Sequence, residues 1–191
     1  MLEFNLLISA VGGQGARLLS RVIGKAALCS GFNVRIGETL GMAQRGGSVL
    51  GFVRLGSEIR GPIIPAGKTD TLVALEPVEG LRAAKFLSAE YTKMSLVNTD
   101  QVPSSLVTLG LAEYPDEETI LRCLRALSNR VLAFDATELA EQCGSARVMN
   151  TVMLGALSAT ELMPIPGDFV RKTLEESVRR ESLTANRKAF E

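Results

Sequence analysis

Two glycine-rich segments carry the polar residues best suited to contact a ligand or a partner. The first is the tetrapeptide GGQG, made of Gly12, Gly13, Gln14 and Gly15. The second, GMAQRGGS, occupies residues 41–48 and ends in Gln44, Arg45, Gly46, Gly47 and Ser48. An arginine guanidinium presents a planar fork of donors that suits carboxylate or phosphate, and glycine lets another backbone approach closely. Both segments are therefore candidates for contact with a substrate, coenzyme or partner.

The GGQG segment lies between an apolar run, residues 4–11, and a helical pattern, residues 16–30. Backbone N–H groups and the positive end of a helix dipole make such a position a natural anion site. The dinucleotide fingerprint is not met, because Leu18 stands where its third glycine belongs, and no Lys-Ser/Thr pair follows as in a phosphate-binding loop. An anion contact and a structural tight turn therefore both stay open.

The GMAQRGGS segment follows a predicted strand, residues 33–37. The carboxyl end of a strand in an open α/β sheet is where ligands bind. A turn into the next strand needs only the two glycines, with Arg45 in solvent. The added Gln44 and Arg45 favour a functional contact over that simpler interpretation.

Three further polar residues stand in or beside apolar segments. Asn150 lies on an otherwise apolar helical pattern, where a buried amide needs partners. We predict a structural hydrogen bond to a neighbouring loop in preference to a ligand contact. Glu76 and Glu79 stand near a predicted helix start, where carboxylates are stabilised. We predict helix capping for them and do not assign them as paired catalytic acids.

Basic residues recur every fourth position at Arg17, Arg21 and Lys25. Like charges at this spacing on a helix repel one another by about 0.2–0.5 kcal/mol per pair. An anion or an acidic partner would offset the repulsion, and a solvated helix face is the simpler alternative.

The chain of 191 residues contains no histidine and only three cysteines, Cys29, Cys123 and Cys143, which are far apart. Histidine-based acid–base catalysis, a Ser-His-Asp triad and histidine-ligated metal sites are thereby excluded. Cysteines without a CxxC spacing also argue against an iron–sulfur cluster or a structural zinc held by this chain. The chain is poorly equipped to act as a self-sufficient catalyst.

The overall charge balance does not indicate a polyanionic partner. Lys plus Arg and Asp plus Glu both number 21, and aromatic residues make up 5% with no tryptophan. Binding of nucleic acid or of a membrane surface is therefore not expected. The apolar N-terminus lacks the basic residues of a leader peptide, and we predict a strand there. No apolar stretch reaches the roughly 18 residues that a membrane-spanning helix needs. We expect a cytoplasmic location.

The order of the elements predicts one domain, residues 1–191, with an α/β fold. It is expected to have three α/β/α layers around a Rossmann-like, mostly parallel sheet. Further strands are expected at 71–76, 93–98 and 130–135, and residues 48–55 and 58–60 are expected to pair as an antiparallel hairpin. Expected helices span 77–87, 116–127 and 147–163, and a surface helix is expected in the last 25 residues.

Taken together, six motifs resemble the gamma-type subunit or domain of the 2-oxoacid:ferredoxin oxidoreductases. In chain order they are VGGQG, GMAQRGGSV, GPIIPAGK, ALEPVEGLR, FDATELA and VMNTVMLGAL, and the resemblance covers residues 5–190. Within the family the small (beta) subunits of the indolepyruvate type are most similar. The resemblance implies the fold of domain III of pyruvate:ferredoxin oxidoreductase.

The resemblance also implies a heteromeric enzyme that oxidatively decarboxylates a 2-oxoacid to an acyl-CoA and passes the electrons to ferredoxin. Thiamine diphosphate, magnesium and [4Fe-4S] clusters would belong to a large partner subunit, with coenzyme A as co-substrate. This chain would bind no cofactor alone and carry no catalytic residue. It would complete the assembly, with its two glycine segments facing the partner, the substrate or coenzyme A, and it could form a homodimer in isolation.

One position departs from the family pattern. Members of the family often have a histidine before Gly-Met-Ala-Gln-Arg, where this chain has Leu40. A relative that acts on a branched-chain 2-oxoacid or on pyruvate therefore stays open beside the aryl-pyruvate type. A free-standing module that binds a nucleotide or coenzyme A through GGQG is the alternative from a different functional class.

Overall fold

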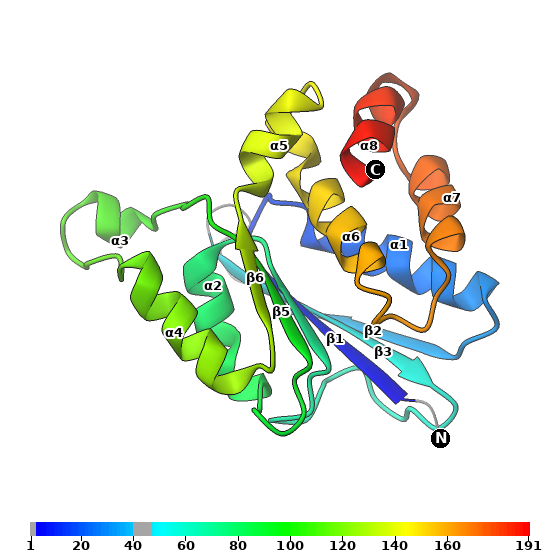
Figure 1. The fold of residues 1–191 in the computed structure, drawn as a ribbon, viewed down its shortest axis with the longest axis horizontal. Coiled ribbons are helices and arrows are strands. Elements are labelled where there is room, and N and C mark those ends of the chain that lie inside the picture. The colour runs from blue at the N-terminus through cyan, green and yellow to red at the C-terminus, as the bar shows by residue number, and fades with distance from the viewer. Residues whose placement is uncertain (1–2, 40–46) are drawn as a thin grey trace.

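The computed structural model describes residues 3–39 and 47–191. A six-stranded sheet lies between two layers of helices (Figure 1). The strands stand in the order β2-β3-β1-β4-β5-β6. Their bounds are β1 Glu3–Val11, β2 Val34–Glu38, β3 Ser48–Gly56, β4 Thr71–Ala74, β5 Met94–Asn98 and β6 Val131–Phe134. The predicted three-layer α/β fold is confirmed.

Strand direction brings most of the connecting loops of interest to one edge. β1, β4, β5 and β6 are parallel neighbours, whereas β3 is antiparallel to both β1 and β2. All strands except β3 therefore end at the same edge, where β3 begins. We call this edge the carboxyl edge; it comprises residues 12–15, 39, 47–48, 75–76, 99–100 and 135.

One face of the sheet is covered by the first helix of the chain and by the helices that follow β6. They are α1 Ala16–Cys29, α5 Ala136–Gln142, α6 Met149–Ala159, α7 Gly167–Ser177 and α8 Leu183–Phe190. Short 3-10 turns, Ala146–Val148 and Arg180–Ser182, precede α6 and α8. β1 packs Leu6 and Ile8 into the core on this face and Leu7 into the core on the other. Because both faces are buried, the strand is mostly apolar, with Asn5 and Ser9 as its buried polar residues.

The opposite face is covered by α2 Pro77–Arg82 and α4 Glu117–Leu127, and a short helix, α3 Ser105–Thr108, lies in the connection between β5 and α4. The predicted helix of residues 77–87 is α2 followed by a 3-10 turn, Ala83–Phe86. Figure 1 shows α3 projecting away from the body of the protein on this side. No helix within residues 3–39 and 47–191 is long and apolar enough to cross a membrane.

Two predictions of local structure are wrong. Residues 58–60 are not a strand, because β3 pairs instead with all five residues of β2. Arg54 of β3 donates to the carbonyl oxygens of Gly61 and Ile63, at 3.0 and 3.2 Å, and these bonds hold the following chain as a loop. The expected surface helix of the last 25 residues is two helices, α7 and α8, because the backbone at Val178 is extended.

Candidate functional site

The described ends of the two glycine segments touch at the carboxyl edge. The N–H of Gly12 donates to the carbonyl oxygen of Gly47 at 2.7 Å. Directly before that contact, Val11 pairs with Ser48 at the end of the β1–β3 ladder. Residues 40–46, which include Leu40, Gln44, Arg45 and Gly46, lie outside the described residues. GGQG and the end of GMAQRGGS therefore form one continuous backbone surface.

Gln14 uses both ends of its side-chain amide inside the protein. Its Oε1 accepts from the N–H of Val11 at 2.8 Å, and its Nε2 donates to the carbonyl oxygen of Leu75 at 3.1 Å. The Leu75 oxygen also accepts from Nδ2 of Asn98 at 3.1 Å. Gln14 thus ties the ends of β1 and β4 together, and the described geometry gives it a positioning role.

The two glycines that flank Gln14 have different surroundings. Gly13 has a φ of +108° and open space where a Cβ would stand. Gly15 has a φ of +90°, and a Cβ there would lie 2.0 Å from Nδ2 of Asn150. That amide donates to the carbonyl oxygen of Gly15 at 3.4 Å. The predicted bond from Asn150 to a neighbouring loop is confirmed, and Gly13 is the part of the turn that is open to a ligand or partner.

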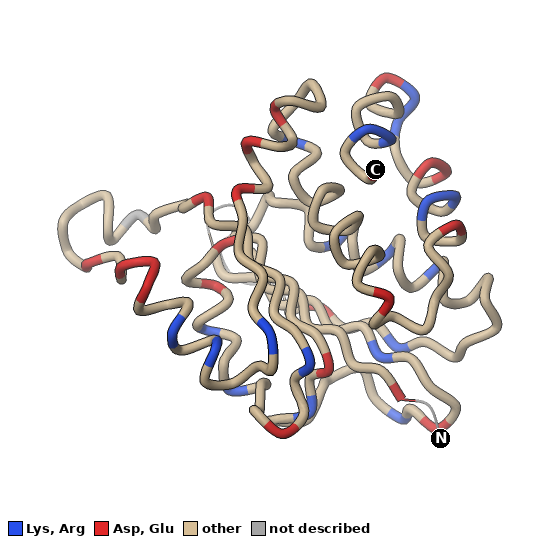
Figure 2. The backbone as a smooth tube through the Cα atoms, in the orientation of Figure 1, with Lys and Arg blue, Asp and Glu red and all other residues tan. Residues whose placement is uncertain are grey.

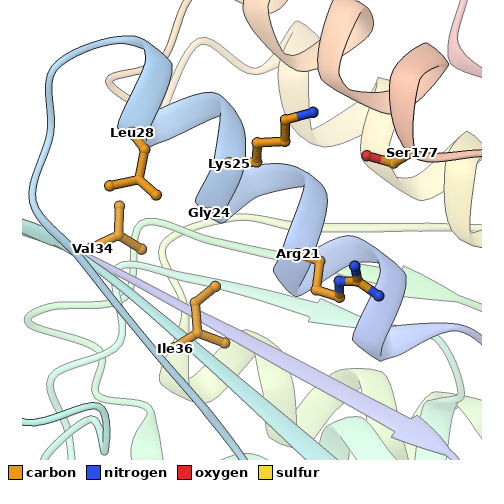
Figure 3. Close-up of a pocket in the computed structure, with 7 residues that line it drawn as sticks. All are labelled: Arg21, Gly24, Lys25, Leu28, Val34, Ile36 and Ser177. Carbon is orange, nitrogen blue, oxygen red and sulfur yellow. The ribbon is translucent and has the colours of Figure 1, made fainter.

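Two cations of the predicted basic stripe have carboxylate partners within the chain. Lys25 pairs with Glu176 of α7 at 2.6 Å, and Arg17 lies 3.7 Å from Glu38 of β2. Arg21 lines a groove of about 400 Å³ between α1 and β2 (Figure 3). Leu28, which is 63% exposed, contributes to its apolar side. The repulsion along the stripe is therefore largely offset inside the molecule.

A second polar site lies at the carboxyl edge, where β4 leads into α2. Glu76 is 1% exposed, and its Oε2 accepts from the N–H of Glu79 at 2.8 Å, which confirms the predicted helix cap. Its Oε1 accepts from the hydroxyl of Tyr114. Burial and this hydrogen bond to a carboxylate raise the pKa of Tyr114 well above its ordinary value. Both oxygens of Glu76 are thus satisfied.

Glu79 differs from Glu76 in its hydrogen bonding. It is 2% exposed, and its Oε1 accepts from Nη1 of Arg82 at 2.5 Å. Its Oε2 is buried and has no hydrogen-bond partner in the part of the chain that the structure describes. The side chain lines a cavity of about 120 Å³, which we call the acidic pocket; Glu76, Glu79, Arg82, Tyr114 and parts of residues 102–115 form its walls.

Sequence reasoning missed the acidic pocket because its two walls are far apart in the chain. The local pattern around Glu79 is that of a helix start, and residues 102–115 show neither a helical nor a strand period. The EPVEGLR spacing is the one signal available, since it places two carboxylates and an arginine on adjacent turns. It does not reveal which oxygen lacks a partner.

The ligand chemistry of the described residues does not fit a metal centre. Residues 3–39 and 47–191 contain no group of three or more Cys, Asp or Glu side chains placed to hold a metal ion. The three cysteines, Cys29, Cys123 and Cys143, are free. A [4Fe-4S] cluster requires four thiolates, one more than the whole chain supplies.

Comparison with known proteins decides the family. The model of the family described as pyruvate ferredoxin/flavodoxin oxidoreductase matches residues 5–191. The chain belongs to the pyruvate ferredoxin/flavodoxin oxidoreductase family. The family resemblance drawn from the six sequence motifs is thereby confirmed.

Members of the pyruvate ferredoxin/flavodoxin oxidoreductase family similar to this chain include two archaeal proteins named indolepyruvate oxidoreductase subunit IorB. The Pyrococcus horikoshii protein is 40% identical over 100% of this chain and 94% of its own length. The Archaeoglobus fulgidus protein is 40% identical over 99% of this chain and 92% of its own length. Both relatives therefore match this chain essentially end to end.

The fold of this family member is also that of a solved structure. The gamma subunit of a keto/oxoacid ferredoxin oxidoreductase from Geobacter sulfurreducens superposes with a TM-score of 0.71. The match covers 98% of this chain and 94% of that subunit at 22% sequence identity. The similarity supports the layered α/β architecture described above.

Proposed function

We propose that this chain is the small subunit of an indolepyruvate-type 2-oxoacid:ferredoxin oxidoreductase. The complex would oxidatively decarboxylate a 2-oxoacid, form the acyl-CoA and pass two electrons to ferredoxin. The observation that carries this proposal is the 40% identity to the IorB subunit of Pyrococcus horikoshii across the whole chain. The lack of histidine in this sequence agrees with a subunit role and favours it over a stand-alone enzyme.

The large partner subunit would hold thiamine diphosphate, magnesium and the [4Fe-4S] clusters. The cysteine count and the absence of a metal-holding group among the described residues support this division of labour. Thiamine diphosphate, when bound in the partner, supplies the carbanion chemistry of the decarboxylation. This chain would complete the partner's active site and not carry the reacting groups.

The carboxyl edge is the face that we assign to the partner and to the approach of substrate or coenzyme A. Its backbone is joined by the hydrogen bond between Gly12 and Gly47, and Gly13 is exposed with open space above its Cα. Gln44, Arg45 and Gly46 belong to the same connection between β2 and β3. A rigid turn next to a glycine-rich connection can meet another backbone closely.

The direct test is co-expression of this chain with the thiamine- and cluster-bearing large subunit. Purified complex should reduce ferredoxin when supplied with coenzyme A and indolepyruvate. Assays with pyruvate and with a branched-chain 2-oxoacid in parallel would assign the substrate class. A chain that turns over a 2-oxoacid without a partner would contradict the proposal.

Arg45→Ala tests the contact assigned to the second glycine segment. We expect the isolated chain to keep its melting temperature, because the substitution removes one long polar side chain from a connecting segment. We expect turnover of the complex, or its affinity for the large subunit, to fall at least about tenfold through loss of a charge-assisted contact. Arg122→Ala on the exposed face of α4 is the matched control and should change neither property.

A second candidate function is binding of coenzyme A or a nucleotide by the isolated chain. The observation in its favour is the start of α1, which has no side-chain cap and no acidic residue in its first turn. Calorimetric titration of the chain with coenzyme A and adenine nucleotides distinguishes the two candidates. Tight binding without the large subunit would favour the second candidate.

A further inference from the structure

The acidic pocket contains a buried carboxylate oxygen that residues 3–39 and 47–191 leave without a partner. Oε2 of Glu79 has no hydrogen bond to any described residue, although the side chain is only 3% exposed and lines the cavity. A buried carboxylate oxygen left in this state is costly. The other acidic side chain of the wall, Glu76, is fully used by a backbone N–H and the Tyr114 hydroxyl. The unpartnered oxygen therefore marks a site for an external donor.

The chemistry of the walls points to a cationic donor. Three carboxylates, Glu76, Glu79 and Glu113, line the cavity, and one cation, Arg82, opposes them. Figure 2 shows further acidic segments close by, where β5 and β6 end and where α4 begins. The described residues form no group that could hold a metal ion. A cavity of about 120 Å³ has room for a group of a few heavy atoms, such as an ammonium or a guanidinium.

Beside the pocket, residues 102–111 form an apolar projection that is exposed to solvent. Its large side chains are Val102, Leu106, Leu109 and Leu111, which are 38%, 54%, 70% and 73% exposed. The chain turns back through Gly110, whose φ is +70°, and the N–H of Leu111 donates to the carbonyl oxygen of Leu106 at 2.9 Å. Several exposed leucines gathered on a projecting segment are typical of a protein interaction site.

The apolar projection and the acidic pocket share residues. Val102 and Leu106 line the pocket and also belong to the exposed apolar set. Val11, which precedes the GGQG turn, lines the same cavity. The pocket is therefore continuous with the carboxyl edge, the face already assigned to the large subunit. Small free cations would use the carboxylates but would leave the leucines exposed, whereas a protein partner would cover both.

We propose that the acidic pocket receives one lysine or arginine side chain of the large subunit, while the apolar projection packs around the segment that carries it. This inference rests on the proposed function, because it takes the large subunit as the partner. The incoming ammonium or guanidinium donates to Oε2 of Glu79. The leucines of the projection exclude water from that ion pair.

The test measures the affinity of the purified large subunit for this chain and for its Glu79→Gln variant. Glutamine keeps the size of the side chain and can still accept from Arg82, but it removes the charge. We expect the dissociation constant of the complex to rise at least about tenfold. Glu176→Gln, an exposed acid of α7 paired with Lys25 on the other side of the sheet, is the matched control and should leave the affinity unchanged. Thermal melts of each variant check that it is folded.

Two measurements keep the proposal falsifiable if Glu79→Gln does not fold. Leu109→Ser changes a 70% exposed side chain of the projection and should weaken the complex severalfold without lowering the melting temperature. Ethylguanidinium chloride at about 10 mM, compared with NaCl at equal ionic strength, should selectively weaken the wild-type complex by competing for the pocket. This concentration is about a hundredfold below the molar range in which guanidinium salts unfold proteins.

Each outcome decides the proposal. The proposal is overturned if a folded Glu79→Gln variant binds the large subunit with unchanged affinity. It is also overturned if Leu109→Ser leaves the affinity unchanged and ethylguanidinium does not compete. Binding of ethylguanidinium to the isolated chain, with a normal complex for Glu79→Gln, would make the pocket a small-cation site and would also overturn it. A wild-type chain that never binds the large subunit would refute the proposed function itself, and this inference with it.

Discussion

The GGQG turn and the acidic pocket lie at the same edge of the sheet, but they differ in whether their polar side chains are fully hydrogen-bonded. In the turn, Gln14 satisfies both ends of its amide with the backbone of Val11 and Leu75. In the pocket, Glu79 is more deeply buried than Gln14, yet the described residues leave one of its carboxylate oxygens without a partner. The turn is thus built to hold a backbone shape, whereas the pocket is built to accept a donor.

The carboxyl edge can therefore contact a partner in two ways, through backbone groups and through charge. The turn offers backbone: Gly13 is open, and Gly12 is already bonded to Gly47. The pocket offers charge, surrounded by the leucines of the apolar projection. Substitutions in the turn should therefore act first on stability, and substitutions in the pocket should act first on binding.

Gly15→Ala should have the largest effect on stability. An alanine there would adopt a φ of +90° and place its Cβ 2.0 Å from Nδ2 of Asn150. We expect the free energy of unfolding to fall by about 2–4 kcal/mol, measured by denaturant titration, because left-handed strain and a steric clash add.

Two companion variants separate the strain from the clash. Gly13→Ala has the strain, at a φ of +108°, but no atom within 4 Å of the new Cβ, and should cost only about 1–2 kcal/mol. Adding Asn150→Ala to Gly15→Ala should recover part of the loss. Equal costs for Gly13→Ala and Gly15→Ala would show that Asn150 does not constrain the turn.

Gln14→Met should have the next largest effect. Methionine has a similar length but cannot bond to Val11 or Leu75, and it leaves the N–H of Val11 without a partner. We expect the free energy of unfolding to fall by about 1–2 kcal/mol, with the affinity of the folded variant for the large subunit largely kept. Gln142→Met on the exposed end of α5 is the control. A stable variant with lost affinity would instead make Gln14 a direct contact.

Tyr114→Phe should have the smallest effect, and its size should depend on pH. The pKa of Tyr114 is raised in the folded state, so its contribution to stability is fully present below the ordinary tyrosine pKa of about 10 and is lost as the pH rises above that value. At pH 8 the variant should be less stable by about 1 kcal/mol through loss of the bond to Glu76.

The check on Tyr114 is a pair of thermal or denaturant melts of wild type and variant between pH 8 and pH 11. The difference in stability should shrink with rising pH. A difference in stability that stays constant across this range would mean that the pKa of Tyr114 is not raised in the folded state.

The sequence predicts the parts of this molecule that depend on local patterns. Apolar runs predict the buried strands, and the glycines before residue 16 predict the turn into α1. The spacing of Glu76 before Pro77 and Glu79 predicts the cap that the structure contains. Even the bond from Asn150 follows from a simple rule, since a buried amide on an apolar helix needs a partner.

The features that the sequence does not predict depend on distant partners. Gln14 is satisfied by Leu75, 61 residues away, so its pattern cannot distinguish a ligand contact from a structural bond. The pairing of β2 with β3 depends on a register that joins separate strands. The loop after β3 is held by bonds from Arg54 to the carbonyl oxygens of Gly61 and Ile63. The acidic pocket forms only when residues 102–115, which have no periodic pattern, pack against α2.

The central claim is that this chain acts as the small subunit of a 2-oxoacid:ferredoxin oxidoreductase. The most direct measurement is ferredoxin reduction by the purified large subunit, with coenzyme A and indolepyruvate, as this chain is titrated in. Activity should rise with added chain and saturate at a fixed ratio of the two subunits. Full activity of the large subunit alone, or no response to the added chain, would contradict it.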